Sequence, residues 1–211
     1  MKAVGFTHSH PIDHAEALLD LDLPDPGAPQ GHDMLVEVRA VSVNPVDTKR
    51  RKSEPPKEGA RVLGFDAAGV VRAVGPDCTL FKPGDAVFYA GVVTRPGSNA
   101  ELQLVDERIV GRKPASLSFA EAAAIPLTAI TAWEGMFDRL GIPQGAEAGK
   151  GDVLLVIGGA GGVGSMVIQI ARAVTGLTIV ATASRPETAE WCRSLGAHHV
   201  VDHHGDMAQQ M

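Results

Sequence analysis

The chain has 211 residues, of which 45% are hydrophobic and 21% charged, and its formal net charge is −6. This length and composition are ordinary for a soluble protein of one large or two small domains. The negative charge argues against a dedicated nucleic-acid-binding protein, which is usually basic. Cys78 and Cys192 are the two cysteines, so neither a disulfide framework nor a cysteine-rich zinc site is expected. No apolar run reaches the roughly 18 residues of a membrane span, so we expect a cytoplasmic protein.

Residues 31 to about 110 have the alternation of β-strands. The run "MLVEVRAVSVNP" places Val36, Val38 and Ala40 on one face, and its phase slips after Ala40 as at a bulge or a strand end. The short basic run 48–52 that follows reads as a solvated loop. Further strands are expected within 69–75, 85–91 and 100–105, separated by Gly/Pro turns. This part predicts a small β-barrel or sandwich.

A helical connector follows. Ser118 and Glu121 have the spacing of a capping box, and Pro126 falls between two helical pieces, where it should end the first.

The last third predicts the order β-α-β-α-β, with strands within 153–157, 177–183 and 198–203 and helices between them. This order is half of a doubly wound dinucleotide-binding fold. Because a six-stranded sheet needs a second such half, we expect the chain to be N-terminally complete but truncated, or a fragment, lacking the nicotinamide-proximal half.

A glycine-rich turn links the first of these strands to its helix. Gly159, Gly161 and Gly164 match G-x-G-x-x-G in that context, which favours binding of a pyrophosphate at the helix N-terminus. A turn that is rich in glycine only for packing is the alternative. The candidate cofactor-binding residues in this turn are Gly159, Ala160, Gly161, Gly162, Val163 and Gly164.

The end of the second strand indicates which dinucleotide is bound. NAD sites usually carry an acid there, about 20 residues after the glycines. Here Ala183 takes that place, followed by Ser184 and Arg185, which favours NADPH through contacts to its 2′-phosphate. Alternatively, Ser184 and Glu187 form a capping box around Pro186.

Taken together, "VSVNPVDTK", "VLGFDAAGVV", "FKPGDAVFYAG", "RPGSNAELQLVDE", "AAAIPLTAITAWE" and "GGAGGVG" resemble the medium-chain dehydrogenase/reductase superfamily, in particular its quinone oxidoreductase branch and the zinc-type alcohol dehydrogenase-like proteins. The resemblance implies an α/β protein. A GroES-like β-barrel domain would occupy residues 1–118, a helical connector 119–149 and a truncated Rossmann domain 150–211. The resemblance also implies that the full-length protein forms a homodimer.

The zinc ligands of that family are replaced in this chain. Zinc-dependent relatives carry a cysteine where this chain has Asn44 and a Gly-His-Glu motif where it has Gly64-Phe65-Asp66, and the segment 90–101 lacks the four cysteines that many of them have. Since catalytic zinc needs three protein ligands, we expect no metal. The histidines of 198–204, and those at positions 8, 10 and 14, are interpreted as surface residues.

The resemblance also suggests catalytic residues that hold the acceptor oxygen or the nicotinamide carboxamide. It assigns this role to Asn44 and Thr131, and less directly to Thr128, Asp47 and Tyr89. Each has a structural alternative: turn formation for Asn44, a bond to its own helix for Thr131, and a place in the barrel core for Tyr89. Relatives often have tyrosine where this chain has Lys49.

The leading hypothesis is therefore an NADPH-dependent, zinc-independent reductase of quinones or enones. An alkenal or enoyl double-bond reductase, and a protein that binds NADPH without turnover, remain alternatives. The partner is a small molecule rather than a nucleic acid or a membrane. Residues 95–99 form either a cleft-rim loop or a plain turn.

Overall fold

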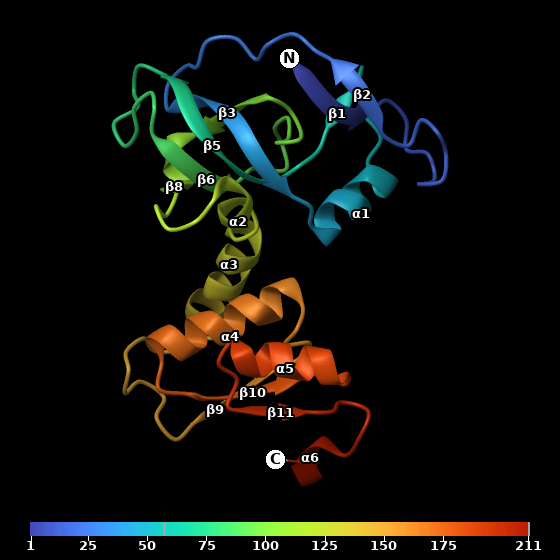
Figure 1. Cartoon of the computed structure of the whole chain (residues 1–211). Helices are drawn as coiled ribbons and strands as arrows, with labels where there is room; N and C mark the ends of the chain where they lie inside the picture. The colour runs from blue at the N-terminus through green and yellow to red at the C-terminus, as the bar shows by residue number, and fades with distance from the viewer. Residues whose placement is uncertain (57, 211) are drawn as a thin grey trace. The chain divides into compact units, whose positions relative to one another are not determined.

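The computed structural model describes residues 1–56 and 58–210. It divides into two compact units, Met1–Leu127 and Thr128–Met211 (Figure 1). The division falls inside the segment 119–149 that the sequence assigns to a helical connector.

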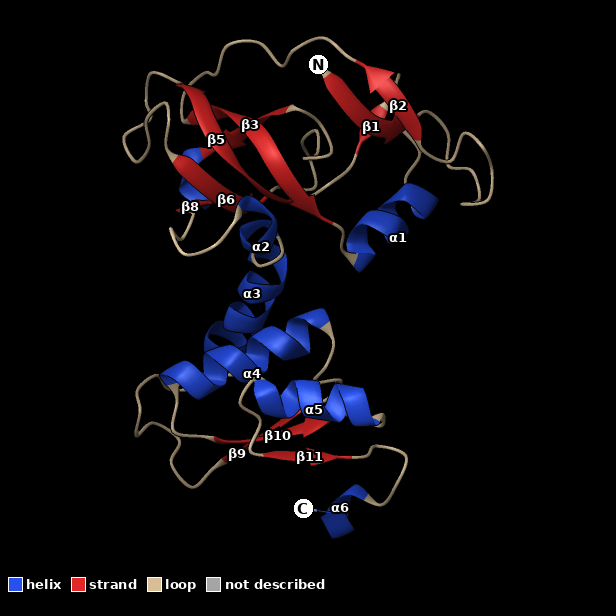
Figure 2. Cartoon of the chain, viewed as in Figure 1, coloured by secondary structure: helices blue, strands red, loops and turns tan. Residues whose placement is uncertain are grey.

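The first unit is built on two antiparallel sheets (Figure 2). The larger has the order β7-β3-β5-β6-β8, and it contains every strand that the sequence predicts in this half. The smaller has the order β2-β1-β4, and it was not predicted from the sequence because its strands have only four, five and two residues. The strands are β1 Lys2–Phe6, β2 Leu19–Asp22, β3 Asp33–Ser42, β4 Arg61–Val62, β5 Asp66–Val74, β6 Ala86–Ala90, β7 Leu102–Asp106 and β8 Val110–Arg112.

The phase slip expected near Ala40 is confirmed. The pairing of β3 with β5 shifts register between Val38 and Ala40, as at a β-bulge. Met34 and Val36, ahead of the shift, are buried in the core, whereas Val41 beyond it is exposed. The bulge lets β3 leave the core and deliver Ser42 opposite Asp66 at the start of β5.

The expectation of a solvated loop at residues 48–52 is wrong. These residues belong to helix α1, Pro45–Ser53, which begins directly after Asn44 with Pro45 in its first turn, where proline is tolerated. Arg51 is buried, and its Nη1 donates to the main-chain oxygen of His10 at 2.8 Å. The basic run therefore anchors the loop that follows β1.

The connector has the predicted local chemistry. In helix α2, Phe119–Ala123, Ser118 and Glu121 form the capping box: the Glu121 N–H donates to Ser118 Oγ at 3.2 Å, and the Ser118 N–H donates to Glu121 Oε2 at 2.8 Å. Helix α3, Pro126–Trp133, starts at the predicted proline and runs into a π-helical turn, Glu134–Arg139. A short 3-10 turn, Glu107–Ile109, precedes β8.

The second unit contains a parallel sheet of order β11-β10-β9, which confirms the β-α-β-α-β prediction. Its strands are β9 Val153–Val156, β10 Thr178–Thr182 and β11 His199–Val201, and its helices are α4 Gly162–Val174, α5 Pro186–Ser194 and the short α6 Met207–Gln210. Helix α4 buries Ser165, Ile168 and Ala171. Val163 is exposed at its first turn.

Candidate functional site

The turn between β9 and α4 is held by the end of the neighbouring strand. Gly158 has a φ of +69°, a conformation that favours glycine, so the tight turn rests on this residue rather than on the first glycine of the motif. The N–H of Gly158 donates to Thr182 Oγ1 at 2.8 Å, and the N–H of Gly159 donates to the Thr182 carbonyl at 3.1 Å. Thr182, at the end of β10, therefore fixes the path of the turn.

The three motif glycines serve different purposes. A Cβ on Gly159 would lie 2.7 Å from the Ala181 Cβ, and one on Gly164 would lie 2.4 Å from the Gly158 oxygen, so both glycines are needed for packing. A Cβ on Gly161 would meet only the Gly158 oxygen, at 3.3 Å. The space beside Gly161 is therefore open to a ligand.

The first turn of α4 offers the donors that a phosphate needs. Gly161, Gly162 and Val163 are exposed, and Gly161 caps the helix without a side-chain hydrogen bond. The first N–H groups of a helix have no partner within it and carry a partial positive charge. Thr128 in α3 lies beside this turn, because a Cβ on Gly162 would approach its Cγ2 to 3.1 Å. Thr131, on the same helix, is exposed.

The segment after β10 is solvent-exposed. Ser184 and Arg185 are exposed, and Arg185 Nε lies 3.1 Å from Glu187 Oε1 in an ion pair on the surface. The capping box considered for Ser184 and Glu187 does not form. The N-cap of α5 is Arg185, whose N–H contacts Thr188 Oγ1 at 3.3 Å, and Pro186 occupies the first turn as expected. An exposed ion pair is weak, so Arg185 is available to a phosphate.

In the first unit, a buried polar network surrounds Asn44. Its Nδ2 donates to Asp66 Oδ2 at 2.8 Å, and its main-chain N–H donates to Asp47 Oδ2 at 2.8 Å. The other Asp47 oxygen accepts from the Gly64 N–H at 3.0 Å. Asp47 therefore ties the start of α1 to the strand connection at Gly64, a structural task that accounts for both of its oxygens.

Asp66 is the network's central acid and has no exposed surface. Its Oδ1 accepts from the Leu127 N–H at 2.8 Å, in the first turn of α3. Burial raises the pKa of Asp66, and nearby Asp47 adds to the rise, while the bonds from Asn44 and Leu127 oppose it. This role was not predicted from the sequence, although one acid inside the apolar run "VLGFDAAGVV" was a signal for it.

Tyr89 is only 2% exposed and belongs to the apolar cluster of the larger sheet. Its hydroxyl donates to Gln103 Oε1 at 2.9 Å, and burial raises its pKa above the ordinary value. These contacts favour the core alternative, so we remove Tyr89 from the candidate catalytic residues. Lys49 is exposed on α1.

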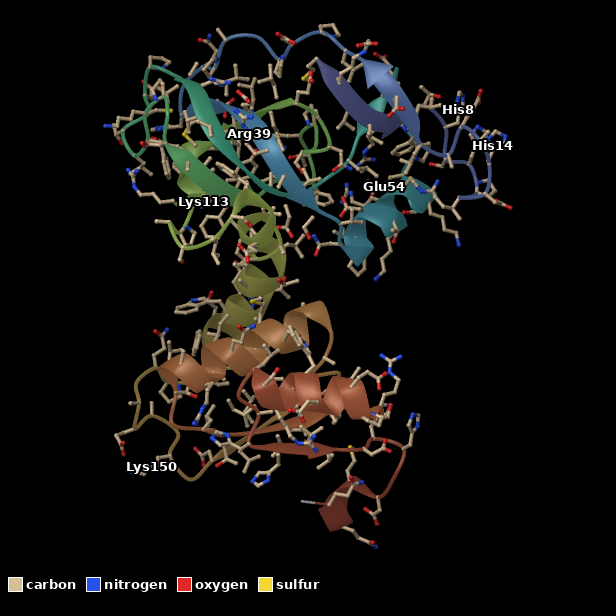
Figure 3. All side chains as sticks on the ribbon, viewed as in Figure 1. His8, His14, Arg39, Glu54, Lys113 and Lys150 are labelled. Carbon is tan, nitrogen blue, oxygen red and sulfur yellow. The ribbon has the colours of Figure 1, made fainter. Side chains whose placement is uncertain are left out.

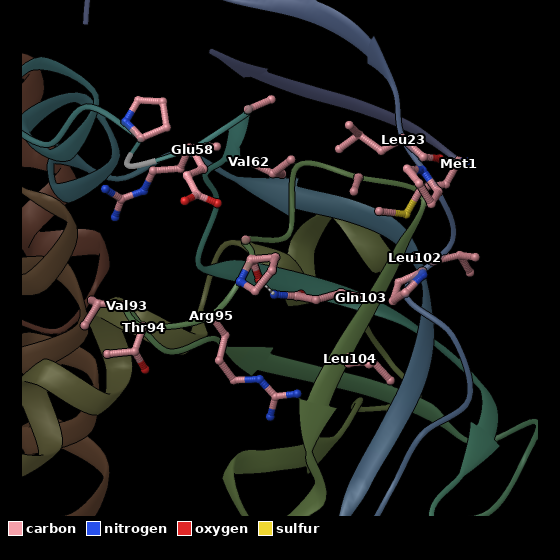
Figure 4. A pocket seen from close by; sticks show the side chains of 18 of the residues that line it. Met1, Leu23, Glu58, Val62, Val93, Thr94, Arg95, Leu102, Gln103 and Leu104 are labelled. Carbon is pink, nitrogen blue, oxygen red and sulfur yellow. Dashed lines mark hydrogen bonds between the residues drawn. The ribbon is translucent and has the colours of Figure 1, made fainter. Parts of the chain in front are cut away.

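A cavity of about 1140 Å³ opens on the first unit (Figure 4). Its lining is mostly apolar and comes from Met1 and from residues in the stretches 23–26, 54–56, 58–62, 93–97 and 100–104. Arg95, Pro96 and Gly97 border it, and the cleft-rim role of residues 95–99 stays a prediction. Asn44, Asp47 and Tyr89 do not line it.

The positions of the zinc ligands are occupied by Asn44, Phe65 and Asp66. Phe65 is buried, and both Asp66 side-chain oxygens are already hydrogen-bonded. Elsewhere, ligand atoms of His10, His14 and Glu16 lie within 4.8 Å of one another on the surface loop after β1, where Figure 3 labels His8 and His14. His10 and His14 were interpreted from the sequence as surface residues, and this cluster was not predicted.

Within residues 1–56 and 58–210, no helix combines the length and apolar character needed to cross a bilayer.

Comparisons with known proteins agree with this architecture. The family model described as "Alcohol dehydrogenase GroES-like domain" matches residues 30–134, and that described as "Zinc-binding dehydrogenase" matches residues 162–211. A zinc-type alcohol dehydrogenase-like protein of Staphylococcus aureus is 48% identical over 210 residues, covering 100% of this chain and 62% of the relative. An NADPH-dependent alkenal/one oxidoreductase of Arabidopsis thaliana is 39% identical over 180 residues, covering 81% of this chain and 45% of the relative.

Two solved structures are similar over almost the whole chain. A Rhizobium etli protein provisionally named a zinc-dependent alcohol dehydrogenase is 62% identical with a TM-score of 0.93, and the match covers 99% of this chain and 60% of that one. The Escherichia coli quinone oxidoreductase complexed with NADPH is 27% identical with a TM-score of 0.80, and the match covers 99% and 61%. The chain thus spans less than two thirds of the length of these relatives.

Proposed function

The chain belongs to the medium-chain dehydrogenase/reductase superfamily, and from that premise we propose that it is part of an NADPH-dependent oxidoreductase that reduces quinones or related activated alkenes and carbonyls without zinc. The observation that carries the proposal is the phosphate-binding turn, whose exposed helix N-terminus and open space at Gly161 suit a pyrophosphate.

The choice of NADPH rests on the residues after β10. Ala183 replaces the acid that would repel a 2′-phosphate, and exposed Ser184 and Arg185 follow it. A guanidinium and a hydroxyl are suitable donors to a phosphate dianion. NADPH supplies the hydride when bound. The chain's residues hold the phosphates through the N–H groups of Gly162 and Val163, and Thr128 borders the same turn.

The proposal of a zinc-free reaction rests on the chemistry of the ligand positions. Asn44 and Phe65 offer no usual zinc ligand, and Asp66 uses its oxygens to hold Asn44 and Leu127. We propose that Asn44 and Thr131 contact the reacting groups.

The experiment is a comparison of acceptors. Purified protein, treated with a chelator and checked for metal by elemental analysis, is mixed with NADPH and either a quinone or an enal, and NADPH loss is followed by absorbance. We expect oxidation that survives the chelator, and faster oxidation with the quinone. Loss of turnover together with loss of one tightly bound zinc per chain would overturn the zinc-free proposal.

A second candidate is an alkenal double-bond reductase, which the 39% identity to the Arabidopsis alkenal/one oxidoreductase favours. Faster turnover of the enal would select it. Tight NADPH binding with no oxidation by any acceptor would instead indicate a binding protein.

A further inference from the structure

Asp66 joins two segments that carry the proposed site. It is the first residue of β5, and its side chain is completely buried. One oxygen accepts from the Asn44 side chain and the other from the Leu127 main chain, each at 2.8 Å. These partners lie 22 and 61 residues away in the sequence. A single carboxylate therefore fixes both Asn44 and the first turn of α3.

The carboxylate determines which way the Asn44 amide points. An ionised carboxylate only accepts hydrogen bonds, so Asn44 must turn its NH2 group towards Asp66 and its Oδ1 away from it. This removes the usual ambiguity between the oxygen and nitrogen of an asparagine side chain. Among the residues described, the Asn44 side chain and the Asp47 N–H are arranged as in a capping box at the start of α1, but Asn44 makes no side-chain cap hydrogen bond there.

The main chain of Asn44 is held by Asp47. Its N–H is bound by Asp47 at 2.8 Å, and its carbonyl accepts from the Asp47 N–H at 3.0 Å. The backbone of Asn44 is thus held independently of Asp66. What Asp66 adds is the direction of the amide.

We propose that Asp66 is a positioning residue that makes Asn44 present its amide oxygen, an acceptor, to the reacting groups. This rests on the proposed function, because it assumes that Asn44 contacts the cofactor or the acceptor molecule. It also chooses between the two tasks that the sequence left open. An amide oxygen suits a donor such as a primary carboxamide, and it does not suit an oxygen that becomes negative during hydride transfer.

The replacement Asp66→Asn reverses the arrangement while keeping the shape. The Leu127 N–H still requires an acceptor, so the oxygen of the new side chain turns towards it, and its NH2 group faces Asn44. Asn44 must then flip to offer its own oxygen to that NH2, which leaves its nitrogen facing the reacting groups. Asp66→Glu, which retains two acceptor oxygens, is the matched control.

The orientation can be measured without any cofactor. The chain has two asparagines, Asn44 and Asn99, so selective 15N-asparagine labelling gives two side-chain NH2 signals, and Asn44→Ser identifies which belongs to Asn44. We expect the Asn44 signal to show one proton shifted far downfield by the carboxylate. Asp66→Asn should abolish that shift, and Asp66→Glu should retain it, with the Asn99 signal unchanged. An unchanged Asn44 signal in a folded Asp66→Asn protein would overturn the proposal.

Kinetics separate this proposal from the proposed function. Asp66→Asn should lower kcat for NADPH oxidation by on the order of tenfold to a hundredfold with little change in the KM of the acceptor, and Asp66→Glu should recover most of it. If the unaltered protein oxidises no NADPH while the NMR result holds, the proposed function fails and the orientation stands. Should Asp66→Asn not fold, absence of a downfield Asn44 proton in the unaltered chain is sufficient to overturn the orientation.

Discussion

Thr182 Oγ1 accepts a hydrogen bond from the Gly158 N–H at 2.8 Å, which links the end of β10 to the glycine turn after β9. The neighbouring Thr182 carbonyl accepts from Gly159 at 3.1 Å, so one residue holds two consecutive positions of the turn. The shape of the candidate phosphate site is thus set from a different strand.

Replacing Thr182 by valine keeps the volume but leaves the Gly158 N–H without its partner. We expect a loss of about 1 kcal/mol in the free energy of unfolding. Both tryptophans, Trp133 and Trp191, lie in the second unit, so urea unfolding followed by their fluorescence reports on it. Thr178→Val on the same strand is the control, and an equal loss there would contradict the role of this hydrogen bond.

Two glycines of the motif should respond differently to alanine. In Gly164→Ala the new Cβ collides with the Gly158 oxygen at 2.4 Å, so the second unit loses stability although alanine is the better helix former. In Gly161→Ala the nearest atom is 3.3 Å away, so the loss of stability should stay within about 1 kcal/mol, the usual cost of alanine at an N-cap.

NADPH binding should be affected by the replacement that leaves the fold nearly unchanged. Gly161→Ala narrows the space for the pyrophosphate and should weaken NADPH binding more than it weakens the fold. Calorimetric titration with NADPH, beside thermal unfolding of the same samples, measures both effects. Strong NADPH binding by Gly161→Ala would mean that the dinucleotide does not lie against this residue.

Arg185→Asp tests the 2′-phosphate assignment. A charge-assisted hydrogen bond contributes about 1.5–3 kcal/mol, so its loss should raise the Kd for NADPH by roughly tenfold to a hundredfold and change that for NADH little. Arg193→Asp, in the helix that Arg185 caps and also paired on the surface, is the matched control. Equal weakening of NADPH and NADH by Arg185→Asp would reject the assignment.

The pKa of Glu107 indicates how acid should affect the stability of the first unit. Burial of its carboxyl opposes ionisation, but the N–H groups of Thr79 and Leu80, at 2.9 Å and 2.8 Å, together with His32, outweigh it and hold the pKa of Glu107 below its ordinary value of 4.5. A pKa that is depressed in the folded state means stability that is complete above the unfolded-state pKa and is lost as pH falls through the folded-state pKa.

Glu107→Gln should therefore lower stability at neutral pH and flatten its decline below pH 4.5. Circular dichroism melts across a pH series measure this, with Glu58→Gln as the exposed control. A decline in acid as steep as that of the unaltered protein would show that other carboxylates control it.

Local patterns in the sequence predicted much of the fold because they depend on near neighbours. The Ser118–Glu121 capping box, the helix start at Pro126 and the β-α-β-α-β order each follow from a few consecutive residues. The basic run at 48–52 was misread as a loop, because the long-range contact from Arg51 to His10 that helps to hold it in place is not visible in the run itself.

The sequence by itself determined the β-α-β-α-β order of the second unit, the glycine turn and the missing acid at Ala183, since all of these are properties of contiguous residues. Only the tertiary structure decided which polar side chains already have hydrogen-bond partners. Tyr89 is bonded to Gln103, Asp47 to Asn44 and Gly64, and Asp66 to Asn44 and Leu127. The reason is physical. A buried polar atom must find a partner, and that partner comes from whichever distant segment the fold brings beside it.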